Sequence, residues 1–146
     1  MTSPSSSLRA AALVLRAVLG GVFIYAAWTK LRTPWEIFAI GIDSYQILPL
    51  WAVRLVAHTL PWFELAVGIL LIVGLWLRGA AVATTVLLGV FFGLMVRAYA
   101  MGQQINCGCF GPGELISWKT LLRDGSLLAA SLALTWMAFT RRRPAV

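Results

Sequence analysis

Charged residues are scarce in this chain. Only 12% of its 146 residues are Asp, Glu, Lys or Arg, whereas 60% are hydrophobic. Charged residues usually make up about 25% of a soluble domain, so this composition excludes an ordinary soluble fold and indicates an integral membrane protein. Because each membrane-crossing helix needs about 20 apolar residues, 146 residues leave room for one small helical bundle. We therefore expect a single membrane domain over residues 1–146.

Acidic residues are scarcer than basic ones, with 5 Asp and Glu against 12 Lys and Arg, which gives a formal charge of +7. In a soluble protein this excess would suggest a nucleic-acid partner. Here several of the basic residues end apolar segments, including Arg141 to Arg143, where they orient a membrane span and meet anionic lipid headgroups. No glycine-rich phosphate loop or other nucleic-acid motif is present. The sequence thus predicts the lipid bilayer, and no nucleic acid, as a partner.

Metal ligands are also few. The chain has two cysteines, Cys107 and Cys109, and one histidine, His58, which is far from them in the sequence. A structural zinc site needs four ligands, so two thiols supply half of one. The sequence predicts no metal site.

Apolar segments predict four transmembrane helices. They cover residues 8–28, 61–77, 80–101 and 118–139, and Pro61 opens or kinks the second. Residues 29–60 mix charges, prolines and aromatic residues, and this composition predicts an interfacial connection at the headgroup level. The expected fold is an all-α integral membrane protein, a four-transmembrane-helix bundle with an interfacial segment between helices 1 and 2.

Four spans would place both termini on the same side of the membrane. The positive-inside rule assigns that side to the cytoplasm because of the cluster from Arg141 to Arg143. We therefore expect a multi-pass protein of the inner or plasma membrane. Its interfacial segment and its cysteine-containing loop would then face outward, into a compartment where thiol pairs form disulfides.

Several ionisable residues fall at one depth in this arrangement, near the outer ends of the predicted helices. Such residues within a span are costly unless they are paired or reach water, so each is a candidate site residue. The alternative for each is a snorkelling side chain or an ion pair that only stabilises the bundle. We expect Arg123 and Glu64 to share one polar network with Lys30 or Asp124. The full set at this depth is Lys30, Glu64, Arg97, Arg123 and Asp124.

The two cysteines stand one glycine apart in the segment INCGCFG, residues 105–111. A disulfide across one residue closes a very small loop and restrains little of the unfolded chain, so a purely structural staple is disfavoured. Gly108 can adopt the turn that joins Cys107 to Cys109, and a strained small ring is reduced easily. The pattern favours thiol redox chemistry.

Five segments carry a resemblance to a known family: WTKLRTP, YQILP, LPWFELAVGILLIVGL, INCGCFG and SWKTLLRDGSLL. With them the chain resembles the DoxX/MauE family of redox-associated membrane proteins, most closely its MauE-like branch. The resemblance implies a four-helix bundle and an auxiliary role in thiol or disulfide metabolism outside the cytoplasm, alongside a thioredoxin-like or other redox partner. It falls on Lys30, Glu64, Cys107, Cys109, Trp118, Arg123 and Asp124.

These observations lead to a thiol–disulfide redox hypothesis, with a possible oxidoreductase activity. Arg123 or Lys30 would favour the thiolate form of one cysteine, and Asp124 and Glu64 would hold these cations or take a proton. One cysteine pair is too few for a complete relay, so the electron acceptor would be external. It would be a second redox protein or a membrane quinone bound near Trp118, Phe110 and the charged cluster that includes Arg97.

Two other classes of function remain open. One is a non-catalytic scaffold subunit that docks a redox partner through the CGCFG loop. The other is a small-solute transporter, which is disfavoured because the sequence shows no inverted repeat.

Overall fold

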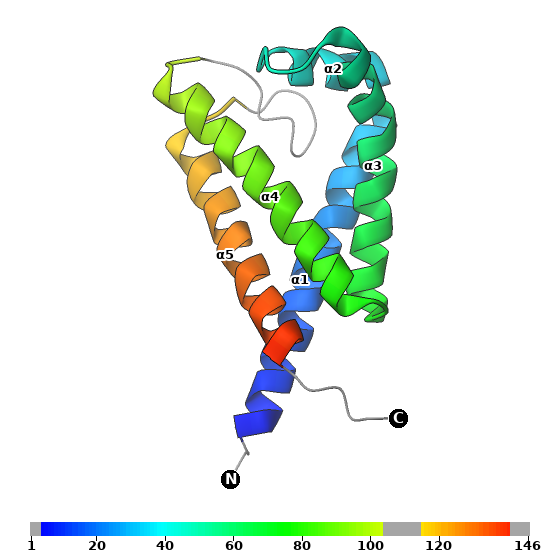
Figure 1. Cartoon of the computed structure of the whole chain (residues 1–146), viewed down its shortest axis with the longest axis vertical. Helices are drawn as coiled ribbons and strands as arrows, with labels where there is room; N and C mark the ends of the chain where they lie inside the picture. The colour runs from blue at the N-terminus through cyan, green and yellow to red at the C-terminus, as the bar shows by residue number, and fades with distance from the viewer. Residues whose placement is uncertain (1–3, 104–114, 141–146) are drawn as a thin grey trace.

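The computed structural model describes residues 4–103 and 115–140, and these form five α-helices (Figure 1). The start of α1 and the end of α5 lie at the same end of the bundle. We call the opposite end, where α1 ends and α5 begins, the α2 end. The helices are α1 (Pro4–Arg32), α2 (Trp35–Asp43), α3 (Leu50–Val73), α4 (Leu77–Ala100) and α5 (Trp118–Thr140).

The four long helices form two close pairs, α1 with α3 and α4 with α5. Glycines set the first pair. A Cβ atom added to Gly20 would lie 2.9 Å from the carbonyl oxygen of Gly68, and one added to Gly68 would lie 2.9 Å from the carbonyl oxygen of Gly20. In a bilayer, small residues let helix backbones approach, and packing replaces the hydrophobic driving force found in water. The glycines thus bring the α1 and α3 backbones together.

Hydroxyl groups contribute to the second pair. The Thr85 Oγ1 atom lies 3.2 Å from Ser131 Oγ and 3.0 Å from Thr135 Oγ1, and Thr135 also donates a 3.2 Å hydrogen bond to the Ala81 carbonyl. Short hydroxyl side chains commonly join membrane helices in this way. The α4–α5 pair therefore combines apolar packing with polar contacts.

A tight turn joins the two pairs at the end opposite the α2 end. Gly74 ends α3 with φ +84°, a left-handed conformation that glycine adopts without steric cost. The Arg16 guanidinium packs directly against Gly74 and donates hydrogen bonds to the carbonyls of Leu71, at 2.9 Å, and Ile72, at 3.2 Å. These carbonyls belong to the last turn of α3, which has no intrahelical partners for them. Arg16 thus satisfies the end of α3 from inside the bundle.

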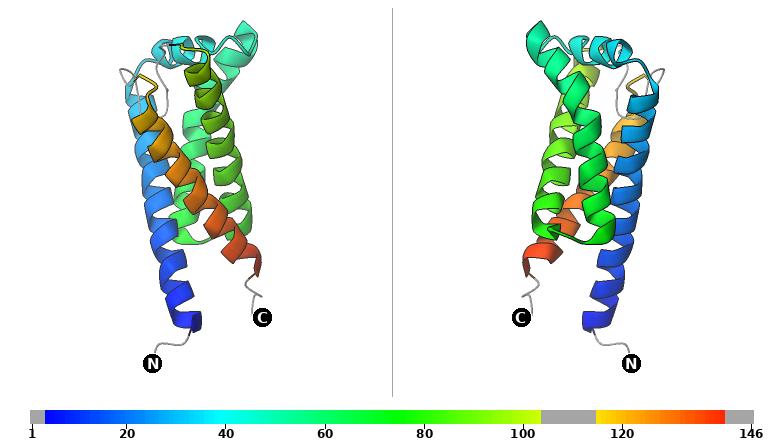
Figure 2. Two further views of the ribbon diagram at one scale, coloured as in Figure 1. Left: turned by 90° about the vertical axis from the view of Figure 1, so that its left-hand side faces the viewer. Right: turned by 90° about the vertical axis from the view of Figure 1, so that its right-hand side faces the viewer.

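From this turn α3 and α4 diverge toward the α2 end, as Figure 1 shows. The short helix α2 lies across that end of the bundle, roughly perpendicular to the long helices (Figure 2). Pro34 precedes α2 and Pro49 precedes α3, at the boundary positions where proline is favoured. Phe38 of α2 and the nearby Tyr45 are both buried. The connection therefore folds back onto the bundle.

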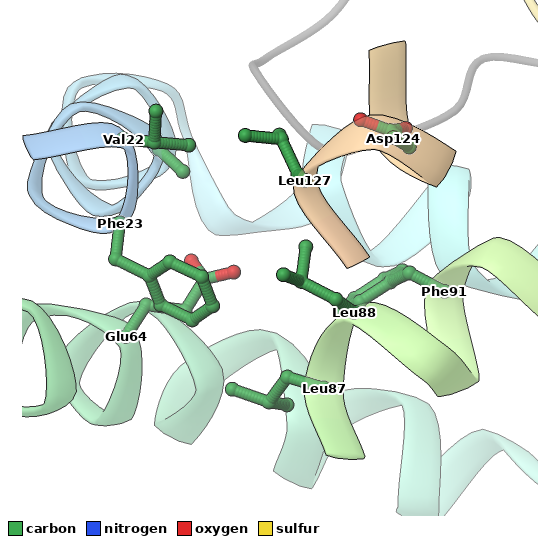
Figure 3. A pocket seen from close by; sticks show the side chains of 9 residues that line it. Val22, Phe23, Glu64, Leu87, Leu88, Phe91, Asp124 and Leu127 are labelled. Carbon is green, nitrogen blue, oxygen red and sulfur yellow. The ribbon is translucent and has the colours of Figure 1, made fainter. Parts of the chain in front are cut away.

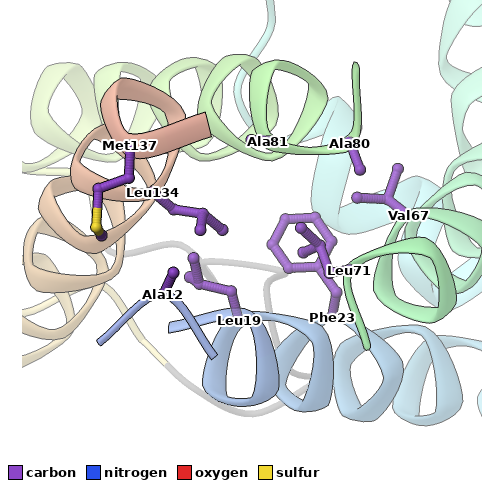
Figure 4. Close-up of a cluster of buried hydrophobic side chains, with 9 residues drawn as sticks. All are labelled: Ala12, Leu19, Phe23, Val67, Leu71, Ala80, Ala81, Leu134 and Met137. Atoms are coloured by element: carbon purple, nitrogen blue, oxygen red, sulfur yellow. The ribbon is translucent and has the colours of Figure 1, made fainter. Parts of the chain in front are cut away.

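The largest hydrophobic cluster lies in the half of the bundle away from the α2 end and draws on all four long helices (Figure 4). Phe23 and Leu19 from α1 meet Leu71 from α3 and Leu134 from α5. Small residues, including Ala80 and Ala81 of α4, complete it. The full cluster is Ala12, Leu19, Phe23, Val67, Leu71, Ala80, Ala81, Leu134 and Met137.

Two of the four predicted helices agree closely with the structure, and the boundaries of the other two are wrong. The predictions 80–101 and 118–139 correspond to α4 and α5. The first helix is longer than the predicted 8–28. The second begins at Leu50 rather than Pro61, and Pro61 lies inside α3. The helix extends on both sides of this proline because Val53, Ala57 and Leu60 are buried, and this packing compensates for the lost backbone hydrogen bond. The interfacial connection is correspondingly shorter than residues 29–60.

Three helical segments in the described parts of the chain are long and apolar enough to cross a membrane: Ser6–Arg32, Leu50–Val73 and Leu77–Ala100. The chain is therefore a helical membrane protein. Helix α5 has 23 residues but carries Lys119, Arg123 and Asp124 in its first two turns, which lower its overall hydrophobicity. The prediction of four spans therefore requires that α5 also crosses the membrane.

Candidate functional site

A buried ion pair joins α1 to α3 near the α2 end. The Lys30 Nζ atom lies 3.0 Å from Glu64 Oε1 and 2.9 Å from Glu64 Oε2, so both carboxylate oxygens accept from one ammonium group. Lys30 is 3% exposed and Glu64 is 5% exposed. Phe38 of α2 places its ring 5.5 Å from the same Nζ atom, a cation–π distance. A single buried cation therefore contacts α1, α2 and α3.

Position along the helices explains why these two side chains meet. Lys30 is in the last turn of α1, and Glu64 follows Pro61 by one turn within α3. The helices are antiparallel, and their backbones already touch at Gly20 and Gly68. Because both charges are removed from water, each is tolerated only while the other is present.

A second ion pair lies in α5. Arg123 Nε is 3.1 Å from Asp124 Oδ1, and Arg123 Nη2 is 3.4 Å from Oδ2. The two residues are adjacent in the sequence but differ in environment: the Arg123 side chain is 34% exposed, whereas that of Asp124 is only 5% exposed. The carboxylate faces the bundle interior while the guanidinium remains accessible. This pair thus presents a cation at the surface near the start of α5.

The carboxylate residue of each ion pair lines one small cavity of about 30 Å³ (Figure 3). Glu64 and Asp124 both line it, and the remaining lining residues are apolar. A cavity of this volume can hold a water molecule where polar groups surround it. Of the five charged residues that the sequence placed at one depth, the structure brings Glu64 and Asp124 to this cavity, each with its ion-pair partner beside it. The cavity is lined by Val22, Phe23, Ala26, Glu64, Leu87, Leu88, Phe91, Asp124 and Leu127.

The other predicted site residues are less closely associated with this cavity. Arg97 is exposed in the last turn of α4, and its Nη1 atom lies 3.5 Å from the Tyr45 carbonyl oxygen. Trp118, the first residue of α5, is 61% exposed, and Lys119 Nζ lies 5.8 Å from its ring centroid. Cys107, Cys109 and Phe110 lie outside the described residues. Their predicted roles remain predictions.

The apolar residues that build the walls of the site were not predicted from the sequence. Leu87 and Phe91 are four residues apart on α4 and line the same cavity as the two carboxylates. Their spacing is a signal for one helix face, but in an apolar helix many residues share that spacing, so it did not single them out. The burial of Tyr45, in a cluster with Met95, Ala98 and Ile116, was not predicted either. Within residues 4–103 and 115–140, no group of three or more His, Cys, Asp or Glu side chains gathers to hold a metal.

Comparison with known proteins adds the family. The family model described as methylamine utilisation protein MauE matches residues 8–137. The chain is 38% identical over 123 residues to the methylamine utilization protein MauE of Paracoccus denitrificans, covering 82% of this chain and 66% of that protein. The corresponding protein of Methylorubrum extorquens is 36% identical over 127 residues, 84% of this chain and 67% of the relative.

A more distant relative is Protein TlpB of Flavobacterium psychrophilum, which is 36% identical over 113 residues, 70% of this chain and 29% of that protein. No solved structure matches the chain. The chain spans about two thirds of the length of the MauE proteins that it matches. Since the family model covers nearly all of the described helices, the chain belongs to the MauE family.

Proposed function

We propose that this protein is a membrane thiol–disulfide redox protein that exchanges electrons through Cys107 and Cys109 and assists the oxidation of a partner outside the cytoplasm. The observation that carries the proposal is the accessible Arg123 guanidinium, which is held by the buried Asp124 in the helix that follows the cysteine segment. A nearby cation favours a thiolate, the form that exchanges with disulfides. The redox association of the family that the sequence resembles supports the same role.

In the proposed reaction the disulfide between Cys107 and Cys109 accepts electrons. A thiolate of the partner attacks one sulfur, the S–S bond breaks, and a mixed disulfide forms while the other cysteine leaves as a thiolate. The second thiolate of the partner then attacks the mixed disulfide and releases the pair as a dithiol. The partner loses two electrons and two protons, and the cysteine pair gains both. An external acceptor, a second redox protein or a membrane quinone, reoxidises the dithiol.

Of the two cations considered for thiolate activation, Arg123 is the one whose side chain is more accessible. Both Glu64 oxygens occupy the Lys30 ammonium in a buried pair, whereas water reaches the Arg123 side chain. We therefore assign Lys30 and Glu64 to holding α1 and α3 in register. Arg123 is assigned to stabilising the cysteine that leaves or attacks as a thiolate, with Asp124 as its positioning residue.

The proposed topology has four spans, with α5 as the fourth, and both termini in the cytoplasm. The arrangement of the helices supports it, because α1, α3, α4 and α5 run side by side and the start of α1 lies at the same end as the end of α5. The cysteine segment would then face outward. After reduction, a membrane-impermeant thiol reagent added from outside should label Cys107 and Cys109. Labelling found only in inverted vesicles would contradict this orientation.

The proposed partner is a thioredoxin-like or other redox protein outside the cytoplasm. The relatives of this chain are methylamine utilization proteins, so the assisted oxidation or maturation would concern a protein of methylamine utilization. The scaffold alternative retains the partner but removes the chemistry. In that case the same loop docks the partner without exchanging electrons.

Single-cysteine variants test the chemistry directly. We expect Cys107→Ser and Cys109→Ser each to abolish oxidation of the partner while the helices remain folded, because a disulfide across one residue contributes little to stability. In Cys107→Ser the Cys109 thiolate can still attack a disulfide of the oxidised partner, and no second cysteine is present to resolve the product, so this variant should accumulate a mixed disulfide that disappears on reduction. Circular dichroism of the purified variants provides the folding control. Full partner oxidation with the double variant Cys107→Ser/Cys109→Ser would overturn the redox proposal and favour the scaffold.

A further inference from the structure

A second, larger cavity lies between α3 and α4, beneath α2. Its volume is about 330 Å³. The cavity exists because α3 pairs with α1 and α4 pairs with α5, so that α3 and α4 diverge from the turn at Gly74 and α2 covers the gap (Figures 1 and 2). Residues that define it are Phe38, Tyr45, Leu60, Leu87, Phe91 and Leu94. We call it the α2 pocket.

The α2 pocket has the size and lining of a site for an apolar small molecule. Such sites usually measure about 300–1,000 Å³ and are lined by hydrophobic and aromatic side chains. Three lining residues, Phe38, Tyr45 and Phe91, are aromatic. Ile47, Leu48 and Val90 also line the pocket and are exposed. Since Val90 lies in the middle of the candidate span Leu77–Ala100, a ligand can enter from the bilayer.

One wall of the α2 pocket is shared with the small cavity that Glu64 and Asp124 line. Leu87 and Phe91 line both, and on the far side of them lie the carboxylates of Glu64 and Asp124 (Figure 3). The pocket is therefore apolar throughout but adjoins the most polar part of the bundle interior. A ligand with an apolar tail and a flat, moderately polar ring matches this arrangement better than a saturated acyl chain does. Aromatic side chains also pack favourably against a planar ring.

We propose that the α2 pocket binds the head ring of a membrane quinone, with its isoprenoid tail leaving through the mouth at Ile47, Leu48 and Val90. This inference rests on the proposed function, because it supplies the external acceptor that the single cysteine pair requires. In the overall reaction the dithiol of Cys107 and Cys109 loses two electrons and two protons, and an S–S bond replaces two S–H bonds. The quinone gains both electrons and both protons and becomes a quinol with two O–H bonds. The location differs from the one expected near Trp118 and Arg97, neither of which lines the pocket.

The experiment is a binding measurement on the full chain in lipid nanodiscs, with a decyl-tailed benzoquinone as the probe. A photoreactive form of this probe should label residues of the α2 pocket, mapped by peptide mass spectrometry. The variant Leu87→Trp should fill the pocket and weaken binding at least about tenfold, a change of about 1.4 kcal/mol. The matched control is Val86→Trp, one residue earlier on α4, which is exposed and does not line the pocket. The control should bind the probe like the unmodified protein.

Each outcome decides the proposal. Labelling concentrated on Leu60, Leu87 or Phe91, and displaced by unlabelled quinone, supports it. Labelling spread over lipid-facing residues, or displaced equally well by added phospholipid, overturns it and indicates an acyl-chain site. Equal binding by Leu87→Trp and Val86→Trp also overturns it. The photolabelling uses the unmodified protein, so the test does not depend on the folding of a variant.

The same measurement on the variant Cys107→Ser/Cys109→Ser separates this inference from the proposed function. The quinone should bind equally well without the thiols, because this variant keeps every residue of the described pocket walls. If quinone binds but the variant Cys107→Ser traps no mixed disulfide, the redox function is refuted and the pocket assignment stands. A trapped mixed disulfide without quinone binding would refute the pocket and require a protein acceptor.

Discussion

The two ion pairs at the α2 end differ in almost every property except their depth. Lys30 and Glu64 come from different helices, are nearly inaccessible, and share two hydrogen bonds of 3.0 and 2.9 Å. Arg123 and Asp124 are neighbours on one helix, and a third of the Arg123 side chain is exposed. The first pair connects α1 to α3, whereas the second keeps a cation at the surface of α5. An ion pair between a basic and an acidic residue thus serves two purposes in one bundle.

The physical difference lies in access to water. A buried ion pair is strongly destabilised when one partner is removed, because the other charge stays behind in a medium that does not solvate it. A cation that reaches water loses less when its partner is changed, and it can stabilise a negative charge that appears during a reaction. We therefore expect the first pair to control stability and the second to control reactivity.

The largest effect should come from breaking the buried pair. Glu64→Leu leaves the Lys30 ammonium buried without its carboxylate, and we expect a loss of about 3–5 kcal/mol in the free energy of unfolding. Lys30→Met should have a comparable cost. Thermal unfolding in detergent, followed by circular dichroism, measures both. The control is the double variant Lys30→Met/Glu64→Leu, which removes both charges and should recover most of the loss. Tolerance of both single variants would contradict the structural role of the pair.

A smaller loss should follow from separating α1 and α3 without touching any charge. Gly68→Ala places a Cβ atom 2.9 Å from the Gly20 carbonyl oxygen, so the two backbones must move apart. Overpacking of this kind costs about 1–3 kcal/mol. The matched control is Gly21→Ala, where an added Cβ meets nothing within 4 Å. Equal unfolding temperatures for the two variants would show that the glycine contact does not set the distance between the helices.

Removal of the accessible cation should cost less still. For Arg123→Gln we expect a loss of about 1 kcal/mol, because a third of the Arg123 side chain reaches water and the glutamine amide can still donate a hydrogen bond to the buried Asp124 carboxylate. The same thermal unfolding measurement applies, with Arg54→Gln as a control for the loss of an exposed cation elsewhere on the α2 side of the bundle. A loss as large as that of Lys30→Met would mean that the two pairs stabilise the fold equally, which would contradict their division into a stabilising pair and a reactive pair.

The smallest effect should come from the hydroxyl contacts between α4 and α5. Thr85→Val preserves the shape of the side chain but removes its contacts with Ser131 and Thr135. Hydrogen bonds between membrane helices average about 0.6 kcal/mol, so we expect a loss of that order. Thr59→Val is a suitable control, because Thr59 is exposed and bonds only within its own helix to the Leu55 carbonyl in the contacts described. A loss above about 2 kcal/mol would show that this contact does more than join the helices.

The sequence was a good guide to the charged residues and a poor one to the helices near α2. Charges inside apolar segments are rare and costly, so the sequence could single them out; four of them form the two ion pairs, whereas Arg97, selected on the same grounds, contacts the Tyr45 carbonyl instead. The start of α3 was mispredicted because Pro61 is a strong local signal for a helix boundary, and the burial of Val53 and Ala57 that overrides it depends on tertiary contacts. The α2 pocket could not be predicted either. It arises from the divergence of α3 and α4, which the order of residues along one helix does not encode.

The most direct test of the division between the two pairs is the rate at which the reduced cysteines react with an alkylating reagent, measured from pH 6 to 9 in matched variants. The account predicts that Arg123→Gln slows alkylation at neutral pH and that the rate recovers at high pH, where the thiolate forms without help from a cation. The double variant Lys30→Met/Glu64→Leu, which lacks the buried pair, should react like the unmodified protein. An unchanged rate in Arg123→Gln, together with a slower rate in the double variant, would contradict the assignment of thiolate stabilisation to Arg123 and would assign it to Lys30 instead.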